Sequence, residues 1–136
     1  MTEPMQPVSE AALTAFDKAH SQVEVDVVER CMAEDYSAST MGPEAEKKIR
    51  AGLGFVSKML RATMVYGAQG ILNDQMDWGK TRLPEYGVST DMVLGNFKRY
   101  TDALRQRLPD EVFAEIAPYL DYMVKMQAEI AGKQQP

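Results

Sequence analysis

The chain has 136 residues, of which 45% are hydrophobic and 26% charged, and its formal net charge is −5. This length and balance are typical of one globular domain and exclude a disordered chain or a fibrous repeat. Cys31 is the only cysteine, which excludes an internal disulfide framework and a multi-cysteine zinc site. No apolar stretch approaches the roughly 18 residues of a membrane span, so we expect none.

The charges are distributed unevenly along the chain. Residues 1–46 carry ten acidic and two basic side chains, whereas residues 47–108 carry eleven basic and five acidic ones. We expect these two parts to neutralise each other in the fold; the alternative is a basic face for an anionic ligand. The basic residues are scattered among acidic ones at helical spacing, which argues against binding of nucleic acid.

Pro4 and Pro7 predict a flexible N-terminal end, because each removes a backbone hydrogen-bond donor. We expect a flexible tail over 1–8, a single helical domain over 9–131 and a second flexible tail over 132–136. The first residues lack the basic and then apolar run of a secretory signal. A single cysteine fits a reducing compartment, so a cytoplasmic location is expected.

Apolar residues spaced three or four apart predict the first helices. Ser21 and Glu24 have the form of a capping box, which predicts a break there and a second helix over 22–35. A loop is expected over 36–42, and Pro43 is expected to begin a further helix. The predicted buried stripes of these helices are Leu13, Phe16, His20, Val23 and Val27, and then Ile49, Leu53, Val56, Leu60 and Met64.

Glycine and proline residues predict the helix ends in the second half of the chain. Gly67 and Gly70 are expected either to end one helix or to allow close packing against a neighbour, and the next helix stops before Pro84. Gly87 predicts a left-handed turn residue, and Ser89 is the expected N-cap of the following helix. The predicted buried residues are Val93, Phe97, Tyr100, Leu104 and Leu108 before a break at Pro109, and Phe113, Ile116, Leu120, Met123 and Ile130 after it. We therefore predict an all-α fold, a single domain of five to six helices that is globin-like or a helical bundle.

The single histidine, His20, restricts the chemistry, because a serine–histidine, cysteine–histidine or histidine-rich metal site would need it. Asp17 precedes it by one turn, but a di-iron bundle needs a second Glu-x-x-His motif, which is absent. We expect His20 on a helix face and Cys31 as a buried apolar side chain, which disfavours an enzyme built on Asp17, His20 and Cys31. Gly52 and Gly54 lack the context of a phosphate loop and are expected to allow close helix contact. No catalytic and no metal-binding residue is predicted.

The chain contains ten methionines, an unusual supply of flexible apolar side chains. Methionine fills irregular space in cores and also forms adaptable binding surfaces, so both core filling and a cavity or partner surface are open interpretations. Trp78 and Tyr86 either fasten a turn to the core or, with Arg82, line the entrance of such a cavity. The candidate ligand-binding residues are Met59, Met64, Trp78, Arg82, Tyr86, Met92, Phe97, Tyr100 and Met123.

The stretch from Trp78 to Met126 resembles the second half of the globin and phycobiliprotein superfamily. A helix ends in Leu-Pro-Glu-Tyr-Gly-Val at 83–88, an amphipathic helix carries Phe97 and Tyr100, and Pro109 leads into a terminal helix. The chain is also similar to the helix-rich cap domains that lie beside cobalamin-binding modules. The resemblance covers about a third of the chain and depends on helix lengths and turn placement.

The chain departs from the cofactor-binding members of that superfamily. Residues 21–136 contain no histidine, so the proximal haem ligand of globins is missing. Cys31 lies too early in the chain for the attachment of a bilin. The resemblance therefore implies a cofactor-free sensor globin, or a cofactor held without a covalent link, although fold alone does not determine function.

The leading hypothesis is a non-enzymatic helical sensor or regulatory module that acts through an apolar pocket or a dimer face. The alternative is a carrier of a non-covalently bound organic cofactor, chromophore or lipid. We expect a homodimer, since helical modules of this size commonly bury a spare apolar stripe against a symmetry mate. A small apolar ligand and a partner protein are the other expected partners, and the sequence leaves the identity of any cofactor open.

Overall fold

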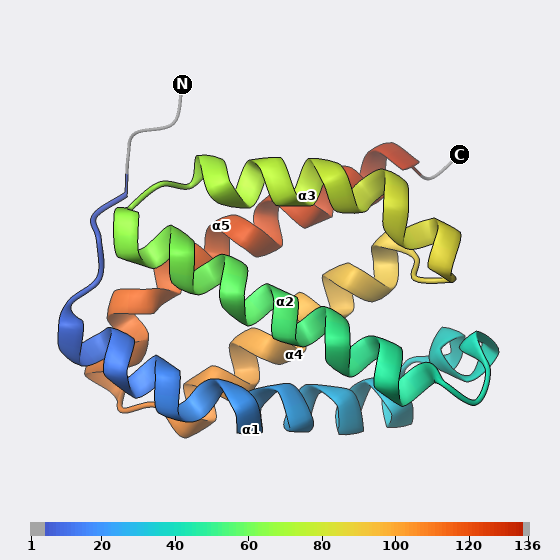
Figure 1. The fold of residues 1–136 in the computed structure, drawn as a ribbon, viewed down its shortest axis with the longest axis horizontal. Coiled ribbons are helices and arrows are strands. Elements are labelled where there is room, and N and C mark those ends of the chain that lie inside the picture. The colour runs from blue at the N-terminus through green and yellow to red at the C-terminus, as the bar shows by residue number, and fades with distance from the viewer. Residues whose placement is uncertain (1–4, 135–136) are drawn as a thin grey trace.

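The computed structural model describes residues 5–134, which form α-helices and short 3-10 helices and contain no strand. The elements, labelled in Figure 1, are α1 (Glu10–Glu34), η1 (Tyr36–Met41), α2 (Ala45–Tyr66), α3 (Gly70–Arg82), η2 (Leu83–Tyr86), α4 (Thr90–Arg107) and α5 (Asp110–Gln134). This confirms the all-α class. No helix in this range combines the length and the apolar content needed to cross a membrane.

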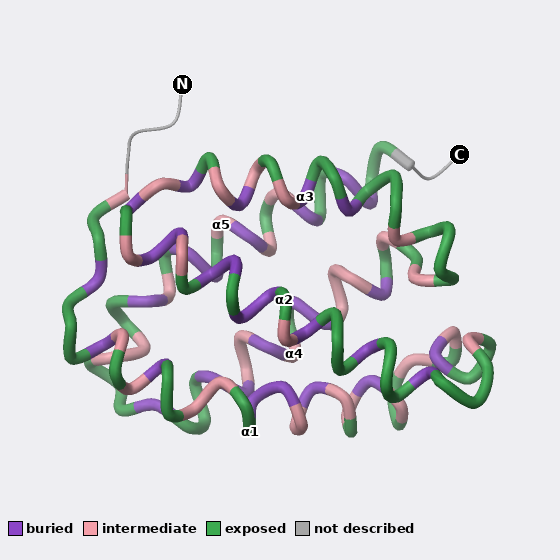
Figure 2. Tube along the Cα trace, viewed as in Figure 1, coloured by how far each residue is buried: buried purple, intermediate pink, exposed green. Residues whose placement is uncertain are grey.

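All five α-helices contribute to one core. In the view of Figure 1, α1 and α3 lie at opposite edges of the molecule, α2 crosses between them, and α4 and α5 pack against each other behind α2. Figure 2 shows that the buried positions of each helix face the interior. Fully buried side chains from successive helices include Phe16, Leu60, Leu72, Leu104 and Leu120. The apolar stripes therefore converge in a helical bundle.

α1 is one continuous helix, so the predicted break at Ser21 is wrong. The helix begins after Ser9, whose hydroxyl accepts a hydrogen bond from the backbone N–H of Ala12. Ser21 is exposed in the middle of the helix. The Glu24 carboxylate faces the interior and accepts a hydrogen bond from Ser57, instead of turning back to cap the chain. The capping-box pattern therefore did not mark a helix start here.

The glycine and serine signals of the second half are confirmed at Gly67, Gly87 and Ser89. Gly70 is the exception, because it is the first residue of α3 and a Cβ added there would meet no atom within 4 Å. Gly67 and Gly87 follow α2 and η2 with φ angles of 62° and 83°, which glycine adopts without steric cost. The Ser89 hydroxyl caps α4 by accepting a hydrogen bond from a backbone N–H in its first turn. These local signals place the ends of α2 and α4 correctly.

The connection between α1 and α2 differs from the prediction. Residues 36–41 form a 3-10 helix where a loop was expected, because the Asp35 side chain accepts hydrogen bonds from the backbone N–H and the hydroxyl of Ser37. α2 begins at Ala45 rather than at Pro43. The two residues before Ala45 form a turn, in which the N–H of Ala45 donates to the carbonyl of Gly42.

The expected flexible tails are partly ordered. Residues 5–8 are held against the fold and residues 132–134 continue α5, which corrects the tails expected over 1–8 and 132–136. The rest of both expected tails lies outside the described residues.

Hydrogen bonds from two backbone N–H groups of the N-terminal segment anchor it to the end of α2 and to the residue before α3. The N–H of Val8 donates to the carbonyl of Met64 at 3.1 Å, and Val8 itself is buried. The N–H of Met5 donates to the side-chain oxygen of Gln69 at 3.2 Å. Pro7 is compatible with this segment, because the backbone donor that proline lacks is not required there.

Ion pairs join the acidic first helix to basic residues of α2 and α4. These pairs are Asp17–Arg61, Glu24–Arg50, Asp26–Arg107 and Glu34–Arg99. They confirm that the acidic first third of the chain meets the basic middle. Ion pairs partly exposed to solvent are screened and contribute little to stability, so the pairs favour this arrangement without dominating its stability.

Candidate ligand-binding groove

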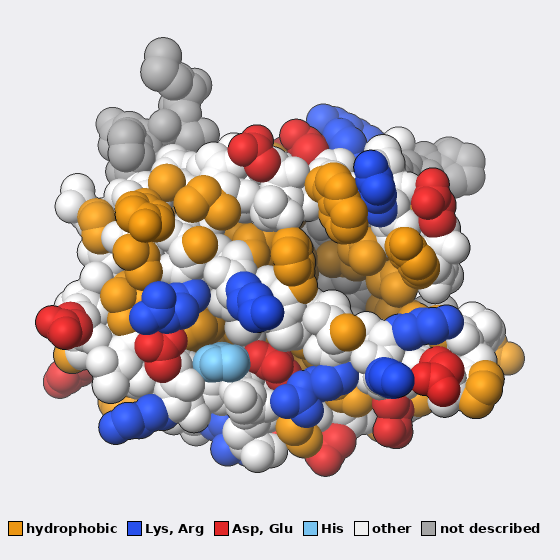
Figure 3. Space-filling view, in the orientation of Figure 1, with side chains coloured by type: hydrophobic (Ala, Val, Ile, Leu, Met, Phe, Trp, Pro, Cys, Tyr) orange, Lys and Arg blue, Asp and Glu red, His pale blue; other side chains and the backbone are white. Residues whose placement is uncertain are grey.

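A groove of about 610 Å³ opens between α2, α3, η2 and the first half of α4. We call it the apolar groove; its lining residues come from 48–59, 75–86 and 88–97, together with Gln127 of α5. Figure 3 shows it as a recess surrounded by hydrophobic side chains. A hollow of this size is large for a protein interior, which is normally packed without such gaps.

The path of the backbone creates the groove. α2 and α3 run in opposite directions and diverge from the turn at Gly67, as Figure 1 shows. The N-terminal half of α2 therefore does not cover the C-terminal half of α3. η2 and the turn at Gly87 then carry the chain across this open end into α4. The groove occupies the space that the diverging helices leave.

The floor of the groove is buried, and its rim is exposed. The floor consists of the buried lining residues, of which Met59, Met92 and Phe97 are at most 6% exposed. The rim aromatics are exposed by 47%, 50% and 65%, and they are Phe55, Trp78 and Tyr86, respectively. Large aromatic side chains gathered at the surface around an apolar hollow are typical of an interaction site.

The structure brings together part of the predicted ligand-binding set. The predicted residues that line the groove are Met59, Trp78, Tyr86, Met92 and Phe97. The others lie elsewhere: Met64, Tyr100 and Met123 are fully buried in the core, where they line neither the groove nor the molecular surface. The guanidinium of Arg82 lies 5.0 Å from the centre of the Trp78 ring and does not line the groove.

The sequence analysis missed the contribution of α2. Lys48, Gly52, Phe55 and Met59 line the groove from one face of this helix, at spacings of four and three residues. A Cβ added at Gly52 would meet no atom within 4 Å, which corrects the close helix contact expected there. Gly54 does approach α1, since its Cβ would lie 3.7 Å from a carboxylate oxygen of that helix. The sequence carried one signal of this contribution: Phe55 is apolar, but it lies beside the predicted buried stripe of this helix and not within it.

The charge of the groove is basic and lies at its rim. Among residues 5–134, the charged side chains that line the groove are Lys48 and Lys80, both exposed, and no acidic side chain lines it. Lys80 also forms an ion pair with Asp77, at 3.3 Å. Deeper in, the Gln127 amide is already bonded to the carbonyl of Thr90 at 3.1 Å. The interior of the groove therefore offers an apolar environment with few polar groups.

A buried polar network joins α1, α2 and α4 beside the groove. Glu24 is 5% exposed, and its Oε2 accepts hydrogen bonds from Ser57 Oγ and His20 Nδ1, each at 2.7 Å. Ser57 gives its single proton to this carboxylate, so the Tyr100 hydroxyl donates to Ser57 Oγ, at 2.6 Å. Val56, which precedes Ser57, and Phe97, which lies about one helical turn before Tyr100, line the groove. The network thus fixes the helices that form the floor.

The network also determines the ionisation of its members. Burial opposes the charge of Glu24, but the hydrogen bonds from His20 and Ser57 and the positive charges of His20 and Arg50 outweigh it, so the pKa of Glu24 lies below its usual value. Burial raises the pKa of the Tyr100 hydroxyl, and the negative charge of Glu24 adds to this effect. At neutral pH the network therefore contains an ionised Glu24 and a neutral Tyr100.

The residues considered for catalysis do not converge. His20 and Cys31 lie on the unbroken α1, where eleven residues correspond to about 16 Å along the helix axis. Cys31 is fully buried, and burial raises the pKa of its thiol. Asp17 is paired with Arg61. In the described part of the chain, no three His, Cys, Asp or Glu side chains are grouped to hold a metal ion.

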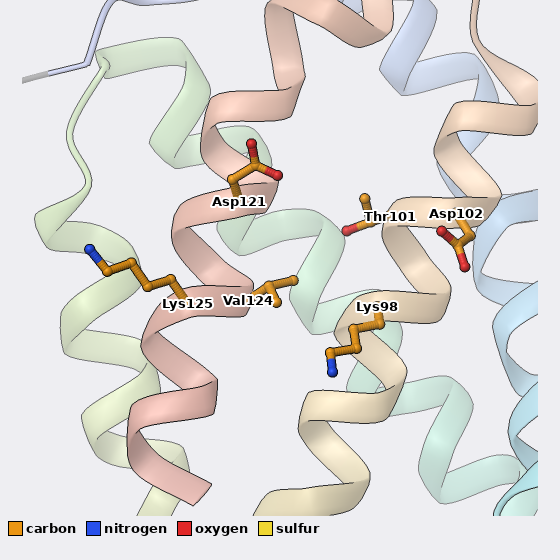
Figure 4. Close-up of a pocket in the computed structure, with 6 residues that line it drawn as sticks. All are labelled: Lys98, Thr101, Asp102, Asp121, Val124 and Lys125. Carbon is orange, nitrogen blue, oxygen red and sulfur yellow. The ribbon is translucent and has the colours of Figure 1, made fainter. Parts of the chain in front are cut away.

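A second hollow, of about 290 Å³, lies between α4 and α5. Figure 4 shows the side chains that line it, which are Lys98, Thr101 and Asp102 from α4 and Asp121, Val124 and Lys125 from α5. Its two basic and two acidic side chains balance, and its only apolar side chain is Val124. It provides no net charge and has less than half the volume of the apolar groove, so the apolar groove is the candidate site.

Comparisons of the chain with family models, with curated proteins and with solved structures find no match. The resemblance to globins and phycobiliproteins therefore stays a prediction. The ligand of the groove is inferred below from the burial, shape and charge of the groove itself.

Proposed function

We propose that this protein is a non-enzymatic sensor module that binds a small apolar molecule in the apolar groove. The observation that carries the proposal is a hollow of about 610 Å³ with a buried apolar floor and an exposed aromatic rim. Ligand sites in proteins commonly measure about 300–1,000 Å³ and are mostly apolar. A ligand that displaces water from the floor gains free energy from the hydrophobic effect.

The elements around the groove support a regulatory response to binding. η2 contributes no residue to the core, and the buried residues of α3 are Leu72, Met76 and Gly79. Elements with few buried contacts open at low free-energy cost. A ligand in the groove contacts α3 and η2 on one side and α2 and α4 on the other. Binding therefore holds α3 and η2 in place, and this ordering is the signal that we propose.

A carrier of an organic cofactor, chromophore or lipid is the second candidate. The half-exposed rim aromatics favour it, because they leave a path for a ligand to enter and leave without unfolding of the core. Sensor and carrier share the same binding step in the same groove. The homodimer and the cytoplasmic location expected from the sequence remain predictions, and binding in the groove depends on neither.

Binding can be measured with N-phenyl-naphthylamine, a neutral apolar dye that fluoresces in apolar surroundings. Trp78 is the only tryptophan and lies on the rim, so its emission reports on the groove alone. We expect dye fluorescence to rise and Trp78 emission to fall with one saturable site. Gly52→Leu places a side chain in the groove and should weaken binding by about tenfold, because this side chain occupies space and covers apolar surface that the dye would otherwise contact.

Gly132→Leu is the matched control for this experiment. Gly132 is also a helical glycine with no atom within 4 Å of an added Cβ, but it lies outside the groove. In both variants leucine replaces glycine within a helix, where it is the better helix former. We expect Gly132→Leu to bind the dye as the parent does. Equal dye affinity in both variants would contradict the proposed site.

A further inference from the structure

The rim of the groove presents positive charge from two helices. Lys48 lies near the start of α2 and Lys80 near the end of α3, and both are exposed. Because α2 and α3 run in opposite directions, these two helix ends lie at the same end of the molecule, one on each side of the groove (Figure 1). No acidic side chain from residues 5–134 lines the groove, so a cationic ligand would meet like charge there.

The rim is also rich in hydrogen-bond donors. A lysine ammonium and the indole of Trp78 donate and do not accept, whereas the hydroxyl of Tyr86 does both. Between residues 5 and 134, no ion pair engages Lys48. Lys80 shares its charge with the exposed Asp77. Lys48 is therefore the stronger of the two positions for an anion.

We infer that the ligand is an amphipathic anion: an apolar chain or ring system that ends in one carboxylate or phosphate group. This inference rests on the proposed function and names the ligand class of the same groove. The apolar part fills the floor, and the anionic group stays at the rim beside Lys48, with Lys80 across the opening. The head group remains hydrated there and avoids the cost of burying a charge. The apolar part supplies most of the affinity, and the lysines select the head group.

Isothermal titration calorimetry of the full chain with four dodecyl compounds tests this inference. The probes are dodecanoate, dodecyl phosphate, neutral dodecanol and the dodecyltrimethylammonium cation. We expect both anions to bind about fivefold more tightly than dodecanol, the size of effect that an exposed ion pair produces. The cation should bind more weakly than dodecanol. A preference for either anion supports the inference and identifies the head group.

The variant Lys48→Met separates the head group from the apolar part. It should reduce dodecanoate affinity toward that of dodecanol and change dodecanol affinity much less, because methionine keeps an apolar side chain at this position. Lys58→Met is the matched control, because Lys58 is exposed on the same helix but does not line the groove. Equal affinities for dodecanoate and dodecanol, unaltered by Lys48→Met, would overturn the inference while the proposed function stands. Failure of all four probes to bind would overturn the proposed function as well.

Discussion

Glu24 is an acidic side chain at a buried position, where loss of water would destabilise its charge. The hydroxyl of Ser57 and the ring of His20 replace that water by hydrogen bonding to one carboxylate oxygen. Arg50 lies 3.4 Å from the other oxygen. These partners hold the charged carboxylate only in the folded chain, where they lower its pKa below that of the hydrated group in the unfolded chain, so the stability of the fold depends on its ionisation.

Glu24→Gln keeps the size of the side chain and removes its charge. At pH 7 we expect it to lower the free energy of unfolding by about 1–3 kcal/mol, the usual cost of weakening a buried hydrogen-bonded group. The lowered pKa of Glu24 means that its charge stabilises the parent fully above about pH 5 and that this contribution is lost as the pH falls through the lowered pKa. The difference between the two proteins should therefore shrink in acid.

Urea unfolding at a series of pH values, followed by circular dichroism, measures this difference. Glu29→Gln is the control, since Glu29 is exposed on the same helix and should show little effect at any pH. A constant difference between the parent and Glu24→Gln from pH 7 to acid would show that the charge of Glu24 is not what stabilises the network.

Apart from His20, which lies four positions earlier on the same helix, the members of the Glu24 network were beyond the reach of sequence patterns. Ser57 lies 33 positions away from Glu24, and Tyr100 lies another 43 positions along the chain. The local pattern with Ser21 instead resembled a helix cap. The same limit explains the candidate site: Met59 and Met64 both fall on an apolar face of α2, but only Met59 borders the groove. Helical periodicity identifies a buried face without showing what that face contacts.

At the scale of elements, the turn between α2 and α3 sets the angle that opens the groove. Gly67 adopts a left-handed conformation, and a Cβ at this position would overlap the carbonyl oxygen of Met5 and crowd the ring of Pro7. The turn and the N-terminal segment therefore fit together only with glycine.

Gly67→Ala should lower the free energy of unfolding by about 2 kcal/mol, which includes the cost of a left-handed alanine and the displacement of the N-terminal segment. Gly52→Ala is the paired variant, because Gly52 is helical and faces open space; it should raise stability by up to about 1 kcal/mol. Urea midpoints of the two variants would measure the contrast. Similar midpoints for both would contradict the role assigned to the Gly67 turn.

Helix ends were the most predictable feature of these elements, because each depends on a few adjacent residues. The sequence predicted a helix end at Gly67, a left-handed residue at Gly87 and an N-cap at Ser89, and the structure agrees. The start of α2 is an exception, because it lies at Ala45 and not at Pro43. α1 is another, because the buried side chains of Val23 and Val27 continue the core stripe past Ser21. Packing of these residues favours a continuous helix over the break that the local pattern indicates.

At the scale of the whole molecule, the groove is a property of no single helix. Its floor belongs mainly to α2 and α4, its rim to α2, α3 and η2, and its volume to the divergence of α2 and α3. The sequence indicated the ingredients, which are methionines and a Trp78–Tyr86 cluster, but not the gap between the helices. The all-α class followed from periodicity, whereas the existence of a groove depends on the angles at which the helices pack.

The central claim is that the groove, and not the packed core, receives an apolar ligand. NMR spectra of protein labelled at the methionine methyl groups can test it during titration with N-phenyl-naphthylamine. Met59, Met76 and Met92 line the groove, whereas Met64 and Met123 are fully buried and do not. We predict saturable shifts for the first three methyl signals and little change for the other two. Saturable binding of the dye that leaves the first three signals unchanged, or shifts Met64 and Met123 equally, would contradict the account.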